Sequence, residues 1–297
     1  MSEAAPAPAR LADYVELTKP RLSMLSVLTA LVGYFSARPA HDPARVVLLA
    51  LGASLAAGGV AALNQWMESD TDARMNRTSQ RPIPTGKIAG GSAYVLGWAM
   101  CFIALIIIFT RVGRLSALFT LLTIASYLGW YTPAKRSSRW STEIGAVAGA
   151  FPPLIGWSAA EGRVSALGWI LFGVLFFWQI PHFMAIAWTY RRDYSAVSFP
   201  MLPVRDEAGG KVAGWAFAAT LSLVAVSLLP PILGLSSKWY GFAAAAVGAG
   251  FLWRAALFLS LANRDASARK LFLFSLAYLP LLLGSLVADR LLIIPHT

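Results

Sequence analysis

"VVLLALGASLAAGGVAALNQWMESDTDARMNRTSQRPIPTG" runs from Val46 to Gly86. Residues 46–63 carry no charged side chain, and such a run is long enough to cross the hydrocarbon core of a bilayer as a helix. Three of the chain's 14 acidic residues follow within five positions, and three arginines come directly after them. The stretch therefore predicts a membrane-spanning helix that ends in a dense cluster of charges.

The rest of the chain has the same apolar character. Of its 297 residues, 57% are hydrophobic and 13% are charged, and the mean hydropathy is +0.61. A water-soluble domain carries about 25% charged residues, so a surface this poor in charge indicates that lipid covers most of it. Because backbone groups in lipid must be satisfied within each segment, we expect the spans to be helices.

We read nine apolar runs as spans, of which the first is short. They cover residues 22–37, 46–65, 92–110, 115–131, 143–160, 166–188, 213–233, 239–259 and 271–292. We therefore predict an all-α, polytopic membrane protein with about nine transmembrane helices around a central cavity, in a single domain over residues 1–297. Residues 1–16 lack the apolar core of a signal peptide, and we expect them to be a flexible cytoplasmic N-terminus.

The basic residues are distributed unevenly between the two sides of the membrane. With nine spans, 17 of the 25 Lys and Arg residues lie on the side of the N-terminus, seven lie on the other side, and Arg254 lies within the eighth span. The positive-inside rule then predicts that the N-terminus and the acid-rich loop are cytoplasmic, and a bacterial inner membrane is the expected location. The net charge of +11 does not indicate nucleic acid, because no basic arm or helix is interleaved with aromatics on a polar background.

Asn64, Glu68 and Asp72 are spaced by four residues, so they lie along one face if the helix continues through them. Asp70 then points elsewhere. Carboxylate and amide oxygens suit Mg²⁺, which takes one or two carboxylates and completes its shell with water and substrate phosphate. The arginines that follow suit the phosphate itself. The loop therefore predicts a metal-bridged phosphate or diphosphate site, with a self-paired interfacial loop as the simpler alternative.

Further charged groups lie in loops on the same predicted face. Asp193 follows the sixth span and is expected to complete the metal site, unless it only pairs with an arginine. Lys135, Arg136 and Arg21 are candidates to neutralise diphosphate, although they are equally consistent with positive-inside anchors, as is Lys19. His182 stands alone within the sixth span, where a structural, hydrogen-bonded histidine is the alternative to a ligand.

These residues resemble the intramembrane prenyltransferase superfamily that includes 4-hydroxybenzoate polyprenyltransferase, whose first motif reads roughly N-D-x-x-D-x-x-x-D. Asn64 and Asp72 match its ends, while Gln65 and Glu68 replace two aspartates. Residues 77–86 fit R-T-x-x-R-P-x-x-x-G. The branch most similar to this chain is that of the protohaem IX farnesyltransferases, on the segments "LTKPRLS" (17–23), "YLGWYTPAKRSS" (127–138), "AGAFPPLIGW" (148–157), "PHFMAIAW" (181–188) and "RRDYSAVSFPMLPV" (191–204).

The resemblance implies transfer of the farnesyl group of farnesyl diphosphate to a vinyl group of haem b, with addition of water, to give haem O and diphosphate. It implies a Mg²⁺ cofactor, and haem A synthase or a terminal oxidase as the partner that takes haem O. It implies catalytic metal ligands at Asn64, Glu68, Asp72 and Asp193, diphosphate binding at Arg77, Arg81, Lys135, Arg136 and Arg21, and haem contact at His182.

Two departures from the branch pattern stand out. The second motif of the superfamily is D-x-x-x-D, and only Asp193 matches it, because Thr189 occupies the first position. This leaves the number of Mg²⁺ ions open. Met184 stands where the branch has a tryptophan, which bears on the acceptor pocket. The alternatives are a sister prenyltransferase with an aromatic acceptor, such as a quinone or chlorophyll precursor, and a non-catalytic transporter or haem-binding membrane protein.

Overall fold

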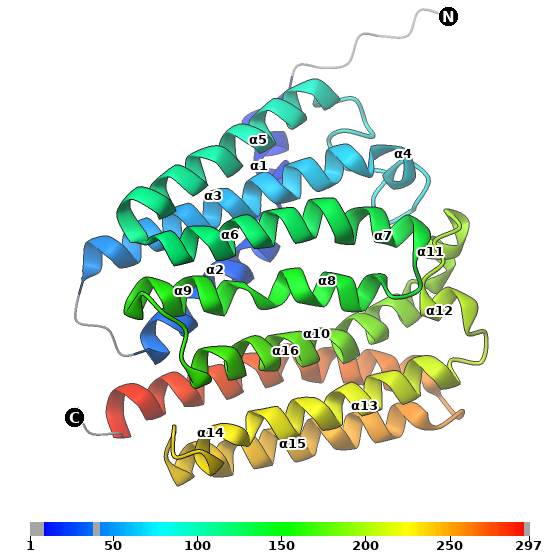
Figure 1. Cartoon of the computed structure of the whole chain (residues 1–297). Coiled ribbons are helices and arrows are strands. Elements are labelled where there is room, and N and C mark those ends of the chain that lie inside the picture. The colour runs from blue at the N-terminus through cyan, green and yellow to red at the C-terminus, as the bar shows by residue number, and fades with distance from the viewer. Residues whose placement is uncertain (1–8, 38–41, 294–297) are drawn as a thin grey trace, which may run out of the picture.

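The computed structural model describes residues 9–37 and 42–293, and every regular element within them is a helix (Figure 1). In chain order the elements are α1 (Leu11–Leu17), α2 (Pro20–Ser36), α3 (Pro43–Met67), α4 (Ser69–Asp72), α5 (Gly90–Ile107), π-helical η1 (Ile108–Val112), α6 (Arg114–Ala125), π-helical η2 (Ser126–Tyr131), α7 (Thr132–Ser137), α8 (Ser141–Ala150), α9 (Pro152–Glu161), α10 (Ala166–Thr189), α11 (Arg191–Ala196), α12 (Leu202–Arg205), α13 (Gly210–Ser227), α14 (Leu229–Ile232), α15 (Lys238–Leu259), α16 (Arg264–Ala288) and η3 (Asp289–Ile293).

The prediction of an all-α polytopic membrane protein is confirmed, but the count of nine spans is not. In the described part of the chain, seven helical segments are long and apolar enough to cross a bilayer: Pro43–Met67, Gly90–Val112, Arg114–Ser137, Ala166–Thr189, Gly210–Ile232, Lys238–Leu259 and Arg264–Leu292. The other two predicted spans are also helical. The first is α2, which has 17 residues. The second is broken into α8 and α9 at Phe151, because Pro152 and Pro153 lack the amide hydrogens that would continue α8.

The broken helix packs closely against α2. A Cβ atom added to Gly33 would lie 2.0 Å from the carbonyl oxygen of Pro153, and one added to Gly156 would lie 1.7 Å from that of Ala30. Only glycine allows these two backbones to approach so closely. Small residues at a contact of this kind are typical of helix packing in membranes, where close van der Waals contact drives association.

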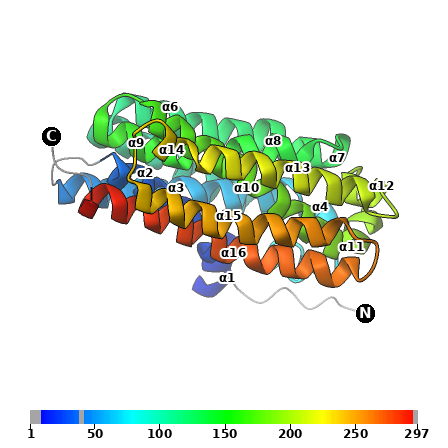
Figure 2. The ribbon, with the colours of Figure 1, turned by 90° about the horizontal axis from the view of Figure 1, so that it is seen from below.

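The short helices α4, α7, α11 and α12 gather at one end of the bundle, as both views show (Figures 1 and 2). The loops in which the sequence analysis found its charged clusters therefore lie at a common end. The packed core falls into separate clusters. The largest joins α10, α13, α15 and α16, while two others join α3 to α2, α5, α6 and α9.

The N-terminal segment differs from the prediction of a flexible tail over residues 1–16. Residues 1–8 lie outside the described part of the chain, but residues 11–17 form helix α1. Leu17 is fully buried and packs with Ala62 and Ile88, which anchors the end of α1 on α3.

Candidate active site

A cavity of about 390 Å³ opens among α2, α3, η2, α8 and α10 near the charged end of the bundle. Its wall contains most of the side chains that the sequence analysis selected. They are Asn64, Glu68, Asp72, Arg77, Arg81, Lys135 and His182. The charged residues come from loop and helix ends, whereas His182 belongs to the middle of α10. One cavity therefore has a charged end and a wall of apolar and aromatic residues.

The acidic column forms although α3 itself ends at Met67. The amide of Glu68 donates to the carbonyl of Asn64 (3.0 Å), and the amide of Asp72 donates to the carbonyl of Glu68 (2.7 Å). Four-residue hydrogen bonds thus carry the helical register from α3 into α4, and all three side chains face the cavity. Asp70 lies outside its wall, as predicted, with its side chain 58% exposed.

Each of the three side chains of the column contacts a lysine or an arginine. Lys135 Nζ lies 2.8 Å from Glu68 Oε1, and Arg81 Nη1 lies 2.5 Å from Asp72 Oδ2. Both pairs are largely shielded from solvent, since Asp72 is 0% and Glu68 5% exposed. Lys19 Nζ donates to Asn64 Oδ1 at 3.2 Å. The cavity wall therefore carries more cations than carboxylates, which suits an anionic ligand.

The buried charges perturb one another's proton affinity. Burial alone raises the pKa of the Glu68 carboxyl, but the Lys135 ammonium outweighs it and holds that pKa below its usual value. Burial, reinforced by the charges of Arg81 and Lys135, lowers the pKa of the Lys19 ammonium to about 7. Glu68 is thus ionised at neutral pH, while Lys19 changes charge near neutrality.

The donor set is compatible with Mg²⁺. Asp72 Oδ1 is a buried carboxylate oxygen with no hydrogen-bond partner, although the other oxygen of the same group binds Arg81. A buried oxygen left in this way costs free energy that a cation would recover. Within the described residues no three His, Cys, Asp or Glu side chains cluster as metal ligands. Two carboxylates and one amide nevertheless match the small protein contribution that Mg²⁺ accepts beside water and phosphate.

The second charged loop joins the first, as expected. The Arg77 guanidinium donates to the Tyr194 hydroxyl (3.1 Å) and lies 5.1 Å from the ring centre of Tyr190. Met75 packs with Phe199 on the same side. These contacts bring residues separated by more than a hundred positions to one cavity mouth.

Three predicted site residues do not line the cavity. Asp193 lies on α11, next to the lining residue Tyr194. Arg136 forms an ion pair with Asp70 (2.5 Å) at the surface. Arg21 is exposed on α2.

Lys19, two residues before Arg21, lines the cavity instead. Lys19 has a left-handed backbone (φ 47°) directly before Pro20, the first residue of α2. A non-glycine residue in this conformation is uncommon, and such strain is concentrated at functional sites. In the sequence, the Lys-Pro dipeptide indicated that the backbone conformation of Lys19 is restricted, because it precedes a proline. It did not indicate where the side chain points.

Gln65, which replaces an aspartate of the superfamily motif, has a structural role. Its Nε2 donates to the carbonyl oxygen of Leu17 at 2.8 Å, and the side chain is buried away from the cavity wall. The amide therefore fastens α1 to α3. A carboxylate has no hydrogen to donate to this carbonyl, so an aspartate at this position could not make the same contact.

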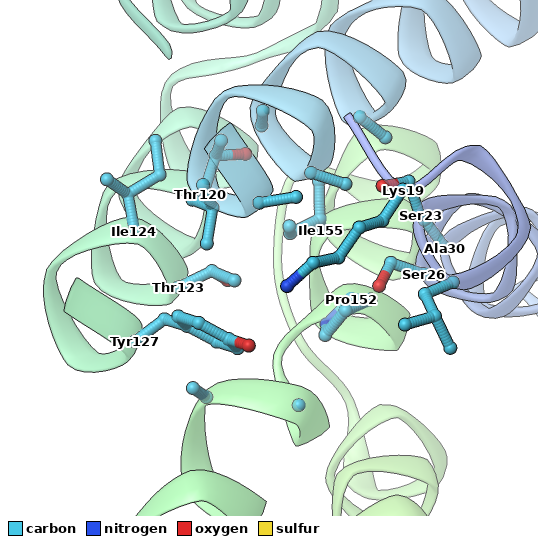
Figure 3. Close-up of a pocket in the computed structure, with 18 residues that line it drawn as sticks. Lys19, Ser23, Ser26, Ala30, Thr120, Thr123, Ile124, Tyr127, Pro152 and Ile155 are labelled. Carbon is cyan, nitrogen blue, oxygen red and sulfur yellow. The ribbon is translucent and has the colours of Figure 1, made fainter. Parts of the chain in front are cut away.

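A second, smaller cavity of about 180 Å³ adjoins the first and is mainly apolar (Figure 3). The Lys19 side chain extends into it, with Thr123 and Tyr127 on the opposite wall. Small residues of α3 form much of its surface: Ala53, Ala56, Ala57, Val60 and Ala61. Lys19 and Tyr127 line both cavities, so the two spaces meet beside the charged end.

Aromatic side chains surround the inner part of the larger cavity. Tyr127 and Tyr131 meet edge to face with ring centres 4.9 Å apart, and Lys135 Nζ lies 4.6 Å from the Tyr131 ring centre. On α10, the rings of Trp178 and His182 are stacked with centres 4.7 Å apart. These aromatic rings line the cavity between its charged end and His182.

Comparison with known proteins connects this geometry to a family. A model of the UbiA prenyltransferase family matches residues 26–277. A protoheme IX farnesyltransferase of Opitutus terrae is 68% identical, over 96% of this chain and 97% of that protein. One from Solibacter usitatus is 39% identical, over 94% of this chain and 98% of that protein.

Solved structures share the fold at low sequence identity. One described as digeranylgeranylglyceryl phosphate synthase in membranes superposes with a TM-score of 0.80 at 17% identity, covering 94% of this chain and 98% of that one. A UbiA homolog from Archaeoglobus fulgidus bound to GPP and Mg²⁺ gives 0.65 at 12% identity, covering 92% and 99%. The helical architecture, the paired charged loops and the family match agree: this chain is a multi-pass membrane protein that belongs to the UbiA prenyltransferase family.

Proposed function

We propose that this protein transfers the farnesyl group of farnesyl diphosphate to a vinyl group of protohaem IX, with addition of water, and releases haem O and diphosphate. The observation that carries the proposal is the pair of adjoining cavities, in which two mainly apolar spaces border the same charged end. Such a site offers charged groups for a diphosphate and two apolar spaces, one for a prenyl tail and one for an apolar acceptor. The shared name of relatives up to 68% identical supports this acceptor and this prenyl donor.

At the charged end, Arg77, Arg81 and Lys135 are the proposed diphosphate ligands, because all three cations line the cavity. Lys19 joins them on the same ground. Negative charge develops on the diphosphate as the carbon–oxygen bond breaks, and fixed cations stabilise that charge where it forms. Arg21 and Arg136, outside the wall, would act on the ligand only from a distance.

Asn64, Glu68 and Asp72 are the proposed Mg²⁺ ligands, since their side chains line the same end and the buried Asp72 Oδ1 has no hydrogen-bond partner. Asp193 remains a proposed ligand from the second loop, next to Tyr194. Mg²⁺ bound there would neutralise the diphosphate and act as a Lewis acid on its oxygens. The UbiA homolog from Archaeoglobus fulgidus bound to GPP and Mg²⁺ supports this cofactor.

The prenyl chain is proposed to occupy the smaller cavity, whose wall is mainly apolar and borders the charged end. The allylic cation formed by departure of diphosphate would then lie beside Tyr127 and Tyr131. Aromatic faces attract cations, and a lipid-embedded wall keeps water away until the acceptor reacts.

The acceptor is proposed to bind in the larger cavity, toward Trp178 and His182. The terminal vinyl carbon of the porphyrin supplies an electron pair and bonds to C1 of the farnesyl group. The positive charge moves to the adjacent vinyl carbon, where water adds and releases one proton. The product is a hydroxyfarnesylethyl porphyrin, and diphosphate leaves.

The charged end is proposed to face the cytoplasm of a bacterial cell, with the protein in the inner membrane, because Lys and Arg are concentrated in loops on that side. Haem A synthase or a terminal oxidase is the proposed recipient of the product, which is too apolar to cross water freely.

The test is to incubate the purified protein with protohaem IX, farnesyl diphosphate and Mg²⁺ and to weigh the porphyrin by mass spectrometry, with a chelator in a parallel sample. We expect a metal-dependent gain of one hydroxyfarnesyl group. Release of diphosphate with a quinone or chlorophyll precursor, and not with haem, would favour a sister prenyltransferase. A folded sample that releases no diphosphate with any acceptor would favour a transporter or a haem-binding protein.

A further inference from the structure

His182 forms a side-chain hydrogen bond with α16, and the Phe272 ring of the same helix lies 5.1 Å from the imidazole, centre to centre. Its Nδ1 lies 2.7 Å from the hydroxyl oxygen of Ser275. One turn earlier on α10, Trp178 Nε1 donates to the backbone carbonyl of the same serine at 2.9 Å. Two side chains of α10 therefore form hydrogen bonds with Ser275. Because the Trp178 ring is also stacked on the imidazole, the plane of the histidine ring is fixed.

The hydrogen atoms of this contact can be assigned by counting donors. The Ser275 hydroxyl oxygen lies 2.6 Å from the backbone carbonyl oxygen of Phe272, and a carbonyl only accepts. The single hydroxyl hydrogen is therefore used on Phe272. Ser275 must then accept a hydrogen from His182, so Nδ1 carries the proton and the neutral ring keeps its lone pair on Nε2.

The second ring nitrogen faces the cavity without a protein partner. His182 lines the larger cavity, and no described residue forms a hydrogen bond with Nε2. Among the described residues, Nε2 is not one of the fully enclosed polar atoms that lack a partner. An unprotonated nitrogen accepts a hydrogen bond or coordinates a metal, but it cannot donate to a carboxylate. This excludes the neutral ring as a donor to a porphyrin propionate and favours coordination of iron.

We propose that His182 Nε2 is an axial ligand of the iron of the bound porphyrin, and that Ser275 is the positioning residue that selects the competent tautomer. The proposal rests on the proposed function, since it takes haem as the acceptor. Histidine ligands of metals commonly donate their other ring hydrogen to a partner that fixes tautomer and orientation, and Ser275 occupies that place. Ligation would also hold the vinyl groups at a constant position relative to the charged end.

The experiment titrates the full-length protein with ferric protohaem IX and, separately, with metal-free protoporphyrin IX, in the absence of farnesyl diphosphate. We expect His182→Ala to change the absorption spectrum of bound haem and to weaken haem binding by at least tenfold, while binding of the metal-free porphyrin stays within about twofold. Added imidazole should restore the spectrum. An identical haem spectrum, or an equal loss for both porphyrins, would overturn the proposal.

Ser275→Ala tests the positioning role. We expect haem affinity to fall about tenfold with little effect on the metal-free porphyrin, and Ser275→Thr to retain wild-type behaviour because it keeps the hydroxyl. Ser227→Ala is the matched control. It removes a buried hydroxyl of α13 that forms a hydrogen bond with Tyr278 on α16, the helix of Ser275, and it lies outside both cavities. If the two alanine variants bind haem alike, Ser275 has no positioning role.

Product formation separates this proposal from the one it rests on. If the wild-type protein farnesylates haem but its haem spectrum does not depend on His182, iron ligation is refuted and the proposed reaction stands. If the folded wild-type protein neither binds nor modifies haem, both proposals fail.

Discussion

Lys135 Nζ lies 2.8 Å from a carboxylate oxygen of Glu68, and both side chains line the cavity to which the metal and diphosphate roles are assigned. The same arrangement recurs at Asp72, which Arg81 holds. The metal ligands and diphosphate ligands proposed for this site therefore neutralise one another in the ligand-free state. A metal–diphosphate complex would exchange these partners, with Mg²⁺ taking the carboxylates and phosphate oxygens taking the cations.

Removal of Lys135 should cost stability because it leaves Glu68 buried and unpaired. We expect Lys135→Met to lower the free energy of unfolding by about 3 kcal/mol, the scale for breaking a buried ion pair. The double variant Glu68→Gln with Lys135→Met should regain most of that stability while remaining inactive. Unfolding in detergent micelles and turnover measure the two effects. Equal stability of Lys135→Met and wild type would show that the pair contributes nothing.

Asp72 and Asp70 provide a matched test of the metal assignment, two residues apart on the same short helix. Asp72 lies in the cavity wall with one oxygen free, whereas Asp70 pairs with Arg136 outside it. We expect Asp72→Asn to reduce turnover more than about 100-fold, as expected for loss of one electrostatic group at the reacting centre. Asp70→Asn should stay within about twofold. A Mg²⁺ titration of both variants is the measurement, and normal turnover in Asp72→Asn would remove it from the metal site.

Lys19 should make anion binding depend on pH. Its pKa is about 7 in the ligand-free protein, and a bound anion stabilises the protonated form and so raises that pKa. Binding of inorganic diphosphate should therefore take up protons at pH 8 and few at pH 6, where Lys19 is already charged. Affinity should fall as the pH rises above 7.

Calorimetry in buffers of different ionisation enthalpy measures that proton uptake. Lys19→Met should abolish the uptake at pH 8, whereas Arg21→Met, a change on the exposed neighbour, should leave it unchanged. Proton uptake that persists in Lys19→Met would assign the titration to another group.

Prenyl length should be set by the depth of the smaller cavity. Ala53 lines it eleven residues before Asn64 on α3, which is about 16 Å along a helix. We expect Ala53→Leu to lower kcat/KM for farnesyl diphosphate about tenfold or more and to spare a shorter prenyl diphosphate. Ser54→Leu, exposed on the outer face of α3, is the control. Equal losses for both chain lengths would place the prenyl chain elsewhere.

The membrane-spanning character and the charged end of the bundle were predictable from sequence, because both depend on local properties. Apolar runs of sufficient length form helices in lipid, and the four-residue spacing of Asn64, Glu68 and Asp72 sets a common face whatever surrounds it. The basic residues in alternate loops predicted which loops share a side of the membrane. The Pro152–Pro153 pair indicates a kink near Phe151. The sequence does not show that the helix there divides into two short helices, α8 and α9.

Only the tertiary structure decided which charges face the interior. Lys19 and Arg21 are two positions apart and look alike in sequence, yet one enters both cavities and the other is exposed. Likewise, Arg136 forms an ion pair with Asp70 outside the cavity. Ser275, 93 residues from His182, determines which nitrogen of the imidazole ring carries the hydrogen. These outcomes depend on helices that are distant in the chain and meet only on folding. Local spacing determines the face of a helix on which a side chain lies, and packing determines what that face contacts.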